Sequence, residues 1–169
     1  HDATLDRVQR RPGRPEALSI DELAEAGIPT LAAVLAAAGP GPFLDVELKG
    51  EPVPEVIPVL EVARGTALAR AVVSSFEADT IAWIGDQRPG WPRWLNAMDL
   101  APSTLRLAAE LGCSGVSVEW HEIDAAGMTR AASMGLEVAA WTVGRRATAA
   151  RLERLGVVAI CVEAAALDG

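Results

Sequence analysis

The sequence has no tyrosine, only two phenylalanines and only two cysteines among its 169 residues. Neither Cys113 nor Cys161 lies in a CxxC pattern or at a metal-ligand spacing from a histidine, which disfavours a metal site built on thiolates. We expect both thiols to be buried or partly buried, because each lies in or beside a predicted strand. No run of 18 uncharged apolar residues occurs, so no transmembrane segment is predicted.

Positive charge is also scarce. The chain has 15 Lys and Arg residues against 23 Asp and Glu, which gives a net charge of −8 and an isoelectric point near 4.8. The one basic cluster lies between Arg7 and Arg14 and is typical of a solvated loop, so a nucleic-acid partner is not expected. Half of the residues are hydrophobic and five are Trp, which suffices for the core of one domain.

The first residue is His1, and neither a methionine nor the basic and apolar segments of a signal peptide accompany it. We therefore expect the chain to continue a longer protein, whose earlier residues would carry any export signal. The residues leave the compartment and the oligomeric state open.

The most informative stretch runs from residue 43 to residue 50, where apolar and charged positions alternate as in a β-strand. One face carries Leu44, Val46 and Leu48, and the other carries Asp45, Glu47 and Lys49. Glu47 and Lys49 should lie about 7 Å apart, close enough to act on one small ligand. Asp45 should lie one layer deeper, in a structural hydrogen-bonding role. Because a parallel sheet covered by helices on both faces is apolar on both, the charged face predicts a barrel whose mouth holds the active site.

Helix and strand signals alternate along the rest of the chain, with glycine following the helices at positions 65, 112, 135 and 156. Residues 1–27 are predicted to form a long loop with a short helical pattern near residues 20–26, and residues 28–169 a single domain. Within that domain, Thr30, Ser103 and Asp124 are predicted to cap helices. Helices are predicted at 30–38, 55–64, 77–84, 103–111, 124–134 and 147–155. Further strands are predicted at 69–74, 93–98, 116–119, 136–143 and 157–162.

This alternation predicts an α/β fold with a parallel sheet of six strands. A doubly wound open sheet would fit the strand count, but its usual G-x-G-x-x-G turn does not occur in the sequence. A TIM-type (β/α) barrel has eight strands. The sequence thus predicts an incomplete barrel, with the first two strand-helix units preceding His1.

Six short segments, in order along nearly the whole chain, are similar to landmarks of the glycerophosphodiester phosphodiesterase family. They are residues 1–7 (His-Asp-Ala-Thr-Leu-Asp-Arg), 28–31 (Ile-Pro-Thr-Leu), 45–49 (Asp-Val-Glu-Leu-Lys), 73–76 (Val-Ser-Ser-Phe), 140–143 (Ala-Trp-Thr-Val) and 155–157 (Leu-Gly-Val). The resemblance implies a TIM-type barrel that uses a divalent metal ion to hydrolyse a glycerophosphodiester, a small molecule, to glycerol 3-phosphate and an alcohol.

The resemblance also implies site residues. His1 would be the second of two catalytic histidines, Glu47 a ligand of Mg²⁺ or Ca²⁺, Lys49 the phosphate contact and Trp141 an aromatic wall beside the glycerol. The family's first histidine, in His-Arg-Gly, and its Glu-x-Asp pair have no counterpart in the sequence and would lie on the two preceding strands. Because one carboxylate alone holds such an ion weakly, we expect this chain by itself to turn over slowly or not at all.

These roles suit the chemistry of a phosphodiester, whose negative charge repels nucleophiles. A metal ion and a lysine neutralise that charge, while an imidazole that titrates near neutral pH protonates the departing alkoxide. The last strand departs from the family, since it ends Cys161-Val162-Glu163-Ala164 where Thr-Asp and a Pro are usual. Gly144 and Val8-Gln9 also replace usual residues, which affects substrate choice more than the reaction class.

Other interpretations stay open at this point. Glu47 and Lys49 could form an internal salt bridge without a ligand, Trp141 could fill the barrel, and Glu119 with His121 is a second candidate acid–base pair. The whole chain could be a non-catalytic binding scaffold. A barrel enzyme acting on sugar phosphates is less well supported, because it would need Gly-rich phosphate loops where residues 144–146 and 163–166 read Gly-Arg-Arg and Glu-Ala-Ala-Ala.

Overall fold

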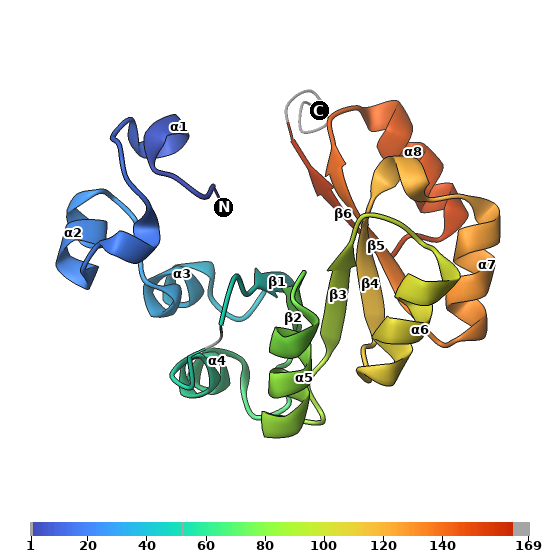
Figure 1. Cartoon of the computed structure of the whole chain (residues 1–169), viewed down its shortest axis with the longest axis horizontal. Coiled ribbons are helices and arrows are strands. Elements are labelled where there is room, and N and C mark those ends of the chain that lie inside the picture. The colour runs from blue at the N-terminus through green and yellow to red at the C-terminus, as the bar shows by residue number, and fades with distance from the viewer. Residues whose placement is uncertain (1, 52, 164–169) are drawn as a thin grey trace.

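The computed structural model describes residues 2–51 and 53–163 of the chain. Its helices are α1 (Asp6–Gln9), α2 (Ile20–Glu25), α3 (Leu31–Ala38), α4 (Val56–Arg64), α5 (Ala78–Gln87), α6 (Pro102–Glu110), α7 (Ala125–Ser133) and α8 (Arg146–Leu155), with short 3₁₀ turns η1 (Pro15–Ala17) and η2 (Trp120–Glu122). Its strands are β1 (Leu44–Glu47), β2 (Ala71–Ser75), β3 (Arg93–Ala97), β4 (Gly115–Glu119), β5 (Glu137–Val143) and β6 (Ala159–Val162). The predicted alternation of helices and strands is confirmed (Figure 1).

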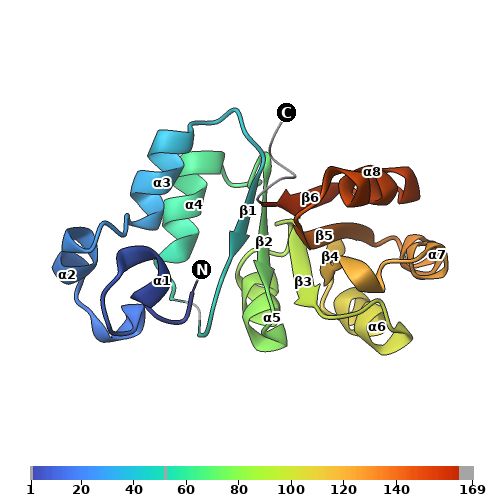
Figure 2. The same ribbon diagram turned by 90° about the horizontal axis from the view of Figure 1, so that it is seen from above.

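The six strands form one parallel sheet in the order β1-β2-β3-β4-β5-β6. A doubly wound sheet reverses its strand order in the middle, so the sequential order excludes that alternative. Viewed from above, the sheet curls, with helices on its outer face and β1 and β6 at the two ends of the curl (Figure 2). The chain therefore has the α/β fold of an incomplete TIM-type barrel, with six of the eight strands of a closed one.

The two faces of β1 lie as the alternating sequence predicts. Leu44, Val46 and Leu48 pack against a cluster on the outer helices that includes Leu35 of α3 and Leu60 of α4. Full burial of a leucine side chain, as in Leu60, stabilises the fold by about 1.5–3 kcal/mol. The charged face of β1 is consequently turned to the inside of the curl.

Two of the predicted helix caps are confirmed. Thr30 accepts a hydrogen bond from the backbone N–H of Ala33 at 3.2 Å, at the start of α3. Asp124 accepts one from the backbone N–H of Gly127 at 2.6 Å, at the start of α7. Both side chains satisfy donors that would otherwise be unpaired in the first turn.

The predicted cap at Ser103 is wrong. Helix α6 begins one residue earlier, at Pro102, whose fixed φ suits the first helical position. The carboxylate of Asp99 serves the helix start instead, because its Oδ1 accepts from Ala101 N at 2.9 Å and from Thr104 Oγ1 at 2.7 Å. These bonds lower the pKa of Asp99.

The inside of the curl has an apolar floor near the amino ends of the strands. Val72, Trp94 and Ala139 form a buried cluster there, contributed by three different strands. Gly115 makes room for Trp94, since a Cβ at this position would lie 3.0 Å from Trp94 Cδ1 and 2.6 Å from the carbonyl oxygen of Glu137. The floor separates the lower end of the curled sheet from the polar residues above it.

The prediction that both thiols are at least partly buried holds for Cys113 and is wrong for Cys161. Cys113 is buried, whereas Cys161 is exposed. Cys161 lies on β6, which among the described strands pairs with β5 alone, so β6 lacks the cover that a neighbour on each side provides.

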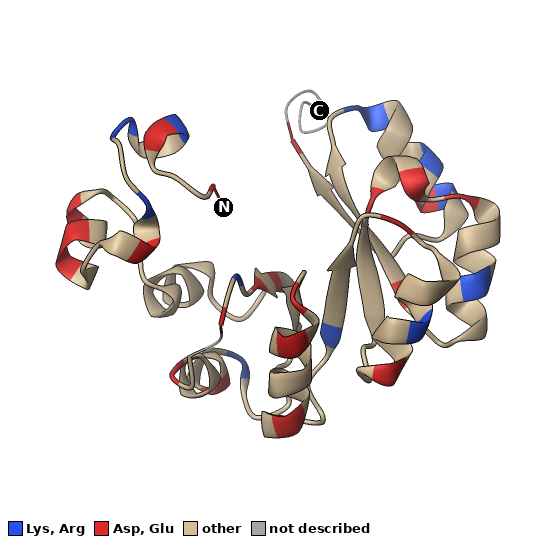
Figure 3. Cartoon of the chain, viewed as in Figure 1, with Lys and Arg blue, Asp and Glu red and all other residues tan. Residues whose placement is uncertain are grey.

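Residues 2–27 carry α1, η1 and α2, and no strand is assigned in this described segment. Charge is unevenly spread over the ribbon, with acidic residues on β1 and α5 and the arginines Arg146, Arg151 and Arg154 on α8 (Figure 3). Among the described residues, no helix is both long enough and apolar enough to cross a membrane.

Candidate functional site

The charged face of β1 opens into a pocket of about 400 Å³ inside the curl. The pocket is lined by Asp45, Glu47, Lys49, Ser74, Phe76, Asn96, Ser117, Trp141, Thr142 and Cys161. Three of the four predicted site residues, Glu47, Lys49 and Trp141, therefore line the same hollow, although Glu47 and Lys49 belong to the β1 segment and Trp141 to β5. His1, the fourth, lies outside the described residues.

Glu47 and Lys49 form an ion pair at the mouth. Lys49 Nζ donates a hydrogen bond to Glu47 Oε1 at 2.8 Å, and the side chains are 52% and 25% exposed for Lys49 and Glu47 respectively. The internal salt bridge considered above thus exists. It does not saturate either group, because an ammonium has three N–H donors and a carboxylate accepts several hydrogen bonds.

Neighbouring hydroxyls hold the backbone around Lys49. Ser75 Oγ lies 2.7 Å from the carbonyl oxygen of Leu48, and Thr80 Oγ1 donates to the carbonyl oxygen of Gly50 at 2.9 Å. Gly50 has φ = 71°, in the left-handed region that glycine adopts most readily. These contacts tie the end of β1 to β2 and α5, so Lys49 extends from a fixed point.

Asp45 lies two residues below Glu47 on the same face of β1 and lines the same pocket. Although its side chain keeps access to solvent, burial among the surrounding atoms raises its pKa, and the charge of Glu47 adds to that rise. A hydrogen bond from Ser74 acts in the opposite direction.

Trp141 forms an aromatic wall with Phe76. The two rings meet edge to face, with centroids 5.7 Å apart and an interplanar angle of 72°. The indole N–H of Trp141 donates to the carbonyl oxygen of Ser117 at 3.0 Å, which fixes the ring against β4. Trp141 therefore faces the pocket rather than filling the floor below it.

Several lining residues carry no individual prediction from the sequence. Phe76 follows the end of β2, and Ser74, Asn96 and Ser117 lie within buried strands. A signal was present, since a lone Asn inside the apolar strand Trp-Leu-Asn-Ala is unusual in a core. Strand alternation alone did not reveal that these positions share one inner layer.

Glu119 and His121 do form a pair. His121 Nδ1 lies 2.7 Å from Glu119 Oε1, and the His121 backbone N–H donates to Glu119 Oε2 at 2.8 Å. The ring of Trp120 stacks on His121 with centroids 3.4 Å apart. These contacts order the turn η2 after β4, and neither residue of the pair is among those that line the pocket.

The carboxylates of Asp45 and Glu47 are the acidic oxygens of the pocket. Mg²⁺ and Ca²⁺ need about six or more oxygen ligands, usually with several carboxylates. Within residues 2–51 and 53–163, no group of three or more His, Cys, Asp or Glu side chains is placed to hold a metal ion. The described residues therefore do not complete a metal site by themselves.

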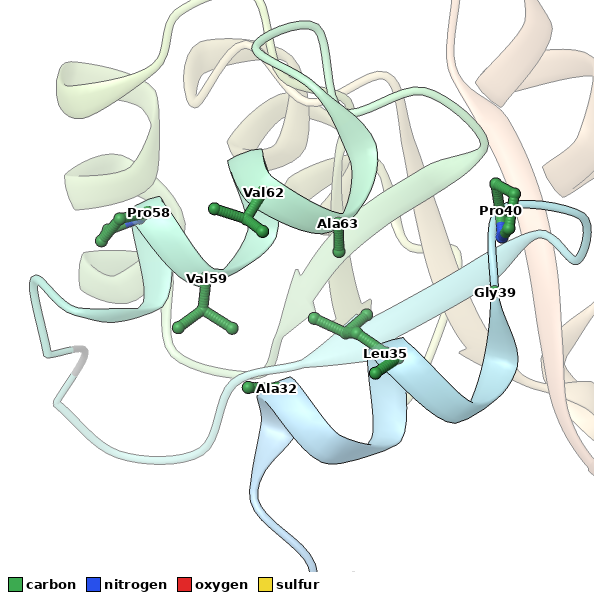
Figure 4. A pocket seen from close by; sticks show the side chains of 9 residues that line it. Ala32, Leu35, Gly39, Pro40, Pro58, Val59, Val62 and Ala63 are labelled. Atoms are coloured by element: carbon green, nitrogen blue, oxygen red, sulfur yellow. The ribbon is translucent and has the colours of Figure 1, made fainter.

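A second hollow, of about 500 Å³, lies on the outside between α3 and α4 (Figure 4). Its lining residues are all apolar, namely Ala32, Leu35, Ala36, Gly39, Pro40, Pro58, Val59, Val62 and Ala63. These side chains offer no acid, base or charge for hydrolysis. The polar pocket inside the curl is the candidate for chemistry.

Alkylation of Cys161 offers a chemical probe of this pocket. Although Cys161 is an exposed residue, neighbouring atoms partly desolvate its thiol, and this effect, followed by the charges of Asp45 and Glu47, raises the pKa of Cys161. Less thiolate is then present at a given pH, so iodoacetamide should react slowly. Removing one charge in Glu47→Gln lowers that pKa, and the rate at pH 8 should rise about two- to fivefold by mass spectrometry.

Cys113 supplies the internal control for this measurement. It is buried, with a pKa raised to about 11, and should stay unmodified in both proteins. An unchanged rate at Cys161 in Glu47→Gln would show that Glu47 does not act on the thiol across the pocket.

Comparisons with known proteins agree with this geometry. The sequence model of the glycerophosphoryl diester phosphodiesterase family matches residues 1–167. No curated protein sequence matches the chain. Among solved structures, a glycerophosphodiester phosphodiesterase of Thermotoga maritima matches with a TM-score of 0.77 and 15% identity, over 96% of this chain and 73% of that one.

Two further structures are similar. A phosphodiesterase of Oleispira antarctica, solved in complex with its product sn-glycerol 3-phosphate, matches with a TM-score of 0.75 and 19% identity, over 96% of this chain and 73% of that one. A glycerophosphodiester phosphodiesterase of Agrobacterium tumefaciens matches with a TM-score of 0.76 and 19% identity, over 99% of this chain and 78% of that one. At these identities the structures establish a shared fold.

Proposed function

Because this chain belongs to the glycerophosphoryl diester phosphodiesterase family, we propose that its inner pocket binds a glycerophosphodiester and that the parent protein cleaves it to glycerol 3-phosphate and an alcohol. The observation that carries the proposal is the convergence of Glu47, Lys49 and Trp141 on one pocket of about 400 Å³. That volume lies within the usual range for small-molecule sites.

Lys49 is the proposed phosphate contact. Its ammonium is half exposed at the mouth and donates to only one carboxylate oxygen in the described contacts. Moving toward a phosphodiester would let it donate to a phosphoryl oxygen as well, which offsets the charge that repels a nucleophile. Trp141 and Phe76 would cover the apolar side of the glycerol carbons.

Glu47 is proposed as the carboxylate that this chain contributes to a divalent ion, Mg²⁺ or Ca²⁺. A bound ion would supply charge neutralisation at the phosphate. Since the described residues do not complete the site, the chain by itself should bind the ion weakly and hydrolyse slowly or not at all. The remaining ligands would come from the acidic pair that the family carries on its first strands.

His1 is proposed as a catalytic histidine on the family pattern alone. The residue next to it is well held, because the Arg7 guanidinium donates to both oxygens of Asp2, at 2.6 and 2.9 Å. The hydrogen bond with Asp2 raises the pKa of Arg7, and the charge of Glu163, which follows β6, contributes to the same rise.

The proposal is tested by binding of sn-glycerol 3-phosphate to this chain, followed through tryptophan fluorescence. Lys49→Met should weaken binding about tenfold or more, because a charge-assisted hydrogen bond is lost. The control is Lys49→Arg, which keeps the positive charge and should lose less affinity for sn-glycerol 3-phosphate than Lys49→Met. Equal affinity of the wild type and Lys49→Met would contradict the assignment of the phosphate to this pocket.

A separate prediction concerns Trp141. Trp141→Leu removes the aromatic face and should weaken binding of sn-glycerol 3-phosphate about tenfold, whereas Trp141→Phe, which keeps an aromatic ring opposite Phe76, should lose less. Isothermal titration calorimetry of both variants measures the difference. If the two variants bind equally well, the aromatic ring does not serve as a wall for the glycerol.

A further inference from the structure

Asn96 has an unused hydrogen-bond acceptor at the bottom of the pocket. The residue lies on β3, is 8% exposed and lines the pocket. Its Nδ2 is 3.4 Å from Ser74 Oγ, and its buried Oδ1 has no hydrogen-bond partner. A buried acceptor without a partner is costly to a fold, so its presence on the wall of a pocket calls for an explanation.

The neighbouring hydrogen bonds fix which way the amide is turned. Ser74 has a single hydroxyl proton, and its effect on the pKa of Asp45 is that of a donor toward the carboxylate. Ser74 Oγ is then left as an acceptor for the Nδ2–H of Asn96. This arrangement leaves Oδ1 as the unpaired acceptor of Asn96, a residue that lines the pocket.

The position of Asn96 suits one part of a ligand. Below it lies the apolar floor around Trp94, two residues earlier on the same face of β3. Above Asp45, one layer higher on β1, lie Glu47 and Lys49 at the mouth. A ligand whose phosphate meets Lys49 would thus direct its uncharged end down toward the acceptor of Asn96.

We propose that Asn96, held by Ser74 and Asp45, is a specificity residue that accepts a hydrogen bond from a free hydroxyl of the polyol part of the substrate. The inference rests on the proposed function for the position of the phosphate. The class of ligand that this pocket would recognise is a polyol phosphate. An alkyl phosphate without hydroxyls would leave Asn96 Oδ1 unpaired. A site built to bond a hydroxyl discriminates strongly against an analogue that lacks it.

The first test compares three ligands, namely sn-glycerol 3-phosphate and its two deoxy analogues, 2-hydroxypropyl phosphate and 3-hydroxypropyl phosphate. In the wild type, loss of the recognised hydroxyl should raise Kd about tenfold for one of the two analogues. In Asn96→Leu, a variant of similar size without the acceptor, all three ligands should bind with the same weakened affinity. Undiminished discrimination in Asn96→Leu, or none in the wild type, would overturn the proposal.

A second measurement needs no variant, which matters if Asn96→Leu does not fold. Asn96 is the single asparagine of the sequence, so labelling with ¹⁵N-asparagine gives the signal of one side-chain amide nitrogen, seen as one pair of NH₂ peaks in the NMR spectrum. Titration with sn-glycerol 3-phosphate should shift that signal, whereas ethyl phosphate should shift it much less. Equal shifts from both ligands would assign Asn96 a purely structural role.

Failure of this inference can be told apart from failure of the proposed function. Inorganic phosphate should bind Asn96→Leu as it binds the wild type and should bind Lys49→Met more weakly. If Lys49→Met binds inorganic phosphate as tightly as the wild type does, while glycerol alone still shifts the NMR signal of Asn96, the phosphate assignment fails and the hydroxyl site stands. If phosphate binding depends on Lys49 but glycerol and its phosphate leave Asn96 unaffected, the hydroxyl site fails alone.

Discussion

The Glu47→Gln variant of the parent protein is expected to lose hydrolysis of glycerophosphodiesters by about 1,000-fold in kcat/KM, the scale of removing one preorganised charge from an active site. Glutamine keeps the shape of the side chain but not the charge that would hold a divalent ion. The same change frees Lys49 from its ion pair, so the phosphate should still bind. We therefore expect the loss mainly in kcat, measured by coupled detection of glycerol 3-phosphate.

The matched control for this variant is Glu51→Gln. Glu51 is an exposed acid four residues further along the same segment and is not among the residues that line the pocket. Its replacement should leave kcat and KM unchanged. If Glu47→Gln kept full activity and only changed thermal stability, the ion pair with Lys49 would be structural and the metal assignment would be wrong.

Arg93→Met is expected to give the largest loss of stability, about 3 kcal/mol in the free energy of unfolding. Arg93 is a buried residue at the start of β3, and its guanidinium donates to the carbonyl oxygens of Trp91 at 3.1 Å and Gly112 at 2.9 Å. It also reaches Leu111 at 3.3 Å. Methionine fills much of the volume but removes the donor from the buried carbonyl of Trp91 and from the part-buried bonds to Leu111 and Gly112, so the cost should be large.

Urea unfolding followed by circular dichroism measures this effect. The control is Arg106→Met, which replaces an exposed arginine on α6 and should change stability by no more than about 0.5 kcal/mol. The stability of Arg93→Lys should fall between those of the two variants, because one ammonium cannot reach the carbonyls bound at both ends of the guanidinium fork. Equal stability of Arg93→Met and the wild type would mean that the carbonyls are satisfied in another way.

The features of the fold that were predictable are those set by local periodicity. The alternation of residues 44–49 assigned one face of β1 to the outer helices and the other to the pocket, and the structure confirms both assignments. The caps at Thr30 and Asp124 were also predictable, since a side-chain oxygen before a helical pattern has few other roles.

Features that depend on contacts between distant strands were not predictable. The floor requires the indole of Trp94 to occupy the space above Gly115 on the next strand, which no pattern within one strand reveals. The exposure of Cys161 follows from the place of β6 at one end of the sheet. Near the start of α6, Asp99, Pro102 and Ser103 lie within five residues, and each is a residue type that can mark the beginning of a helix. Which of them does so depends on the backbone geometry.

The polar layer above the floor is the part of the site that sequence reasoning left out. Ser74, Asn96 and Ser117 come from three different strands and converge only when the sheet curls. Their shared depth depends on the register between strands, for which the sequence contains no local signal. The charged pair Glu47 and Lys49 was recognisable earlier because both residues lie on one strand.

The most direct test of the hydrolytic account is ³¹P NMR of a panel of glycerophosphodiesters incubated with the protein encoded by the complete reading frame. The account predicts that a phosphomonoester signal of glycerol 3-phosphate grows in the presence of Mg²⁺ or Ca²⁺ and is suppressed by EDTA and by Lys49→Met. A panel in which every diester stays intact with either ion would contradict the account and would favour a non-catalytic binding scaffold.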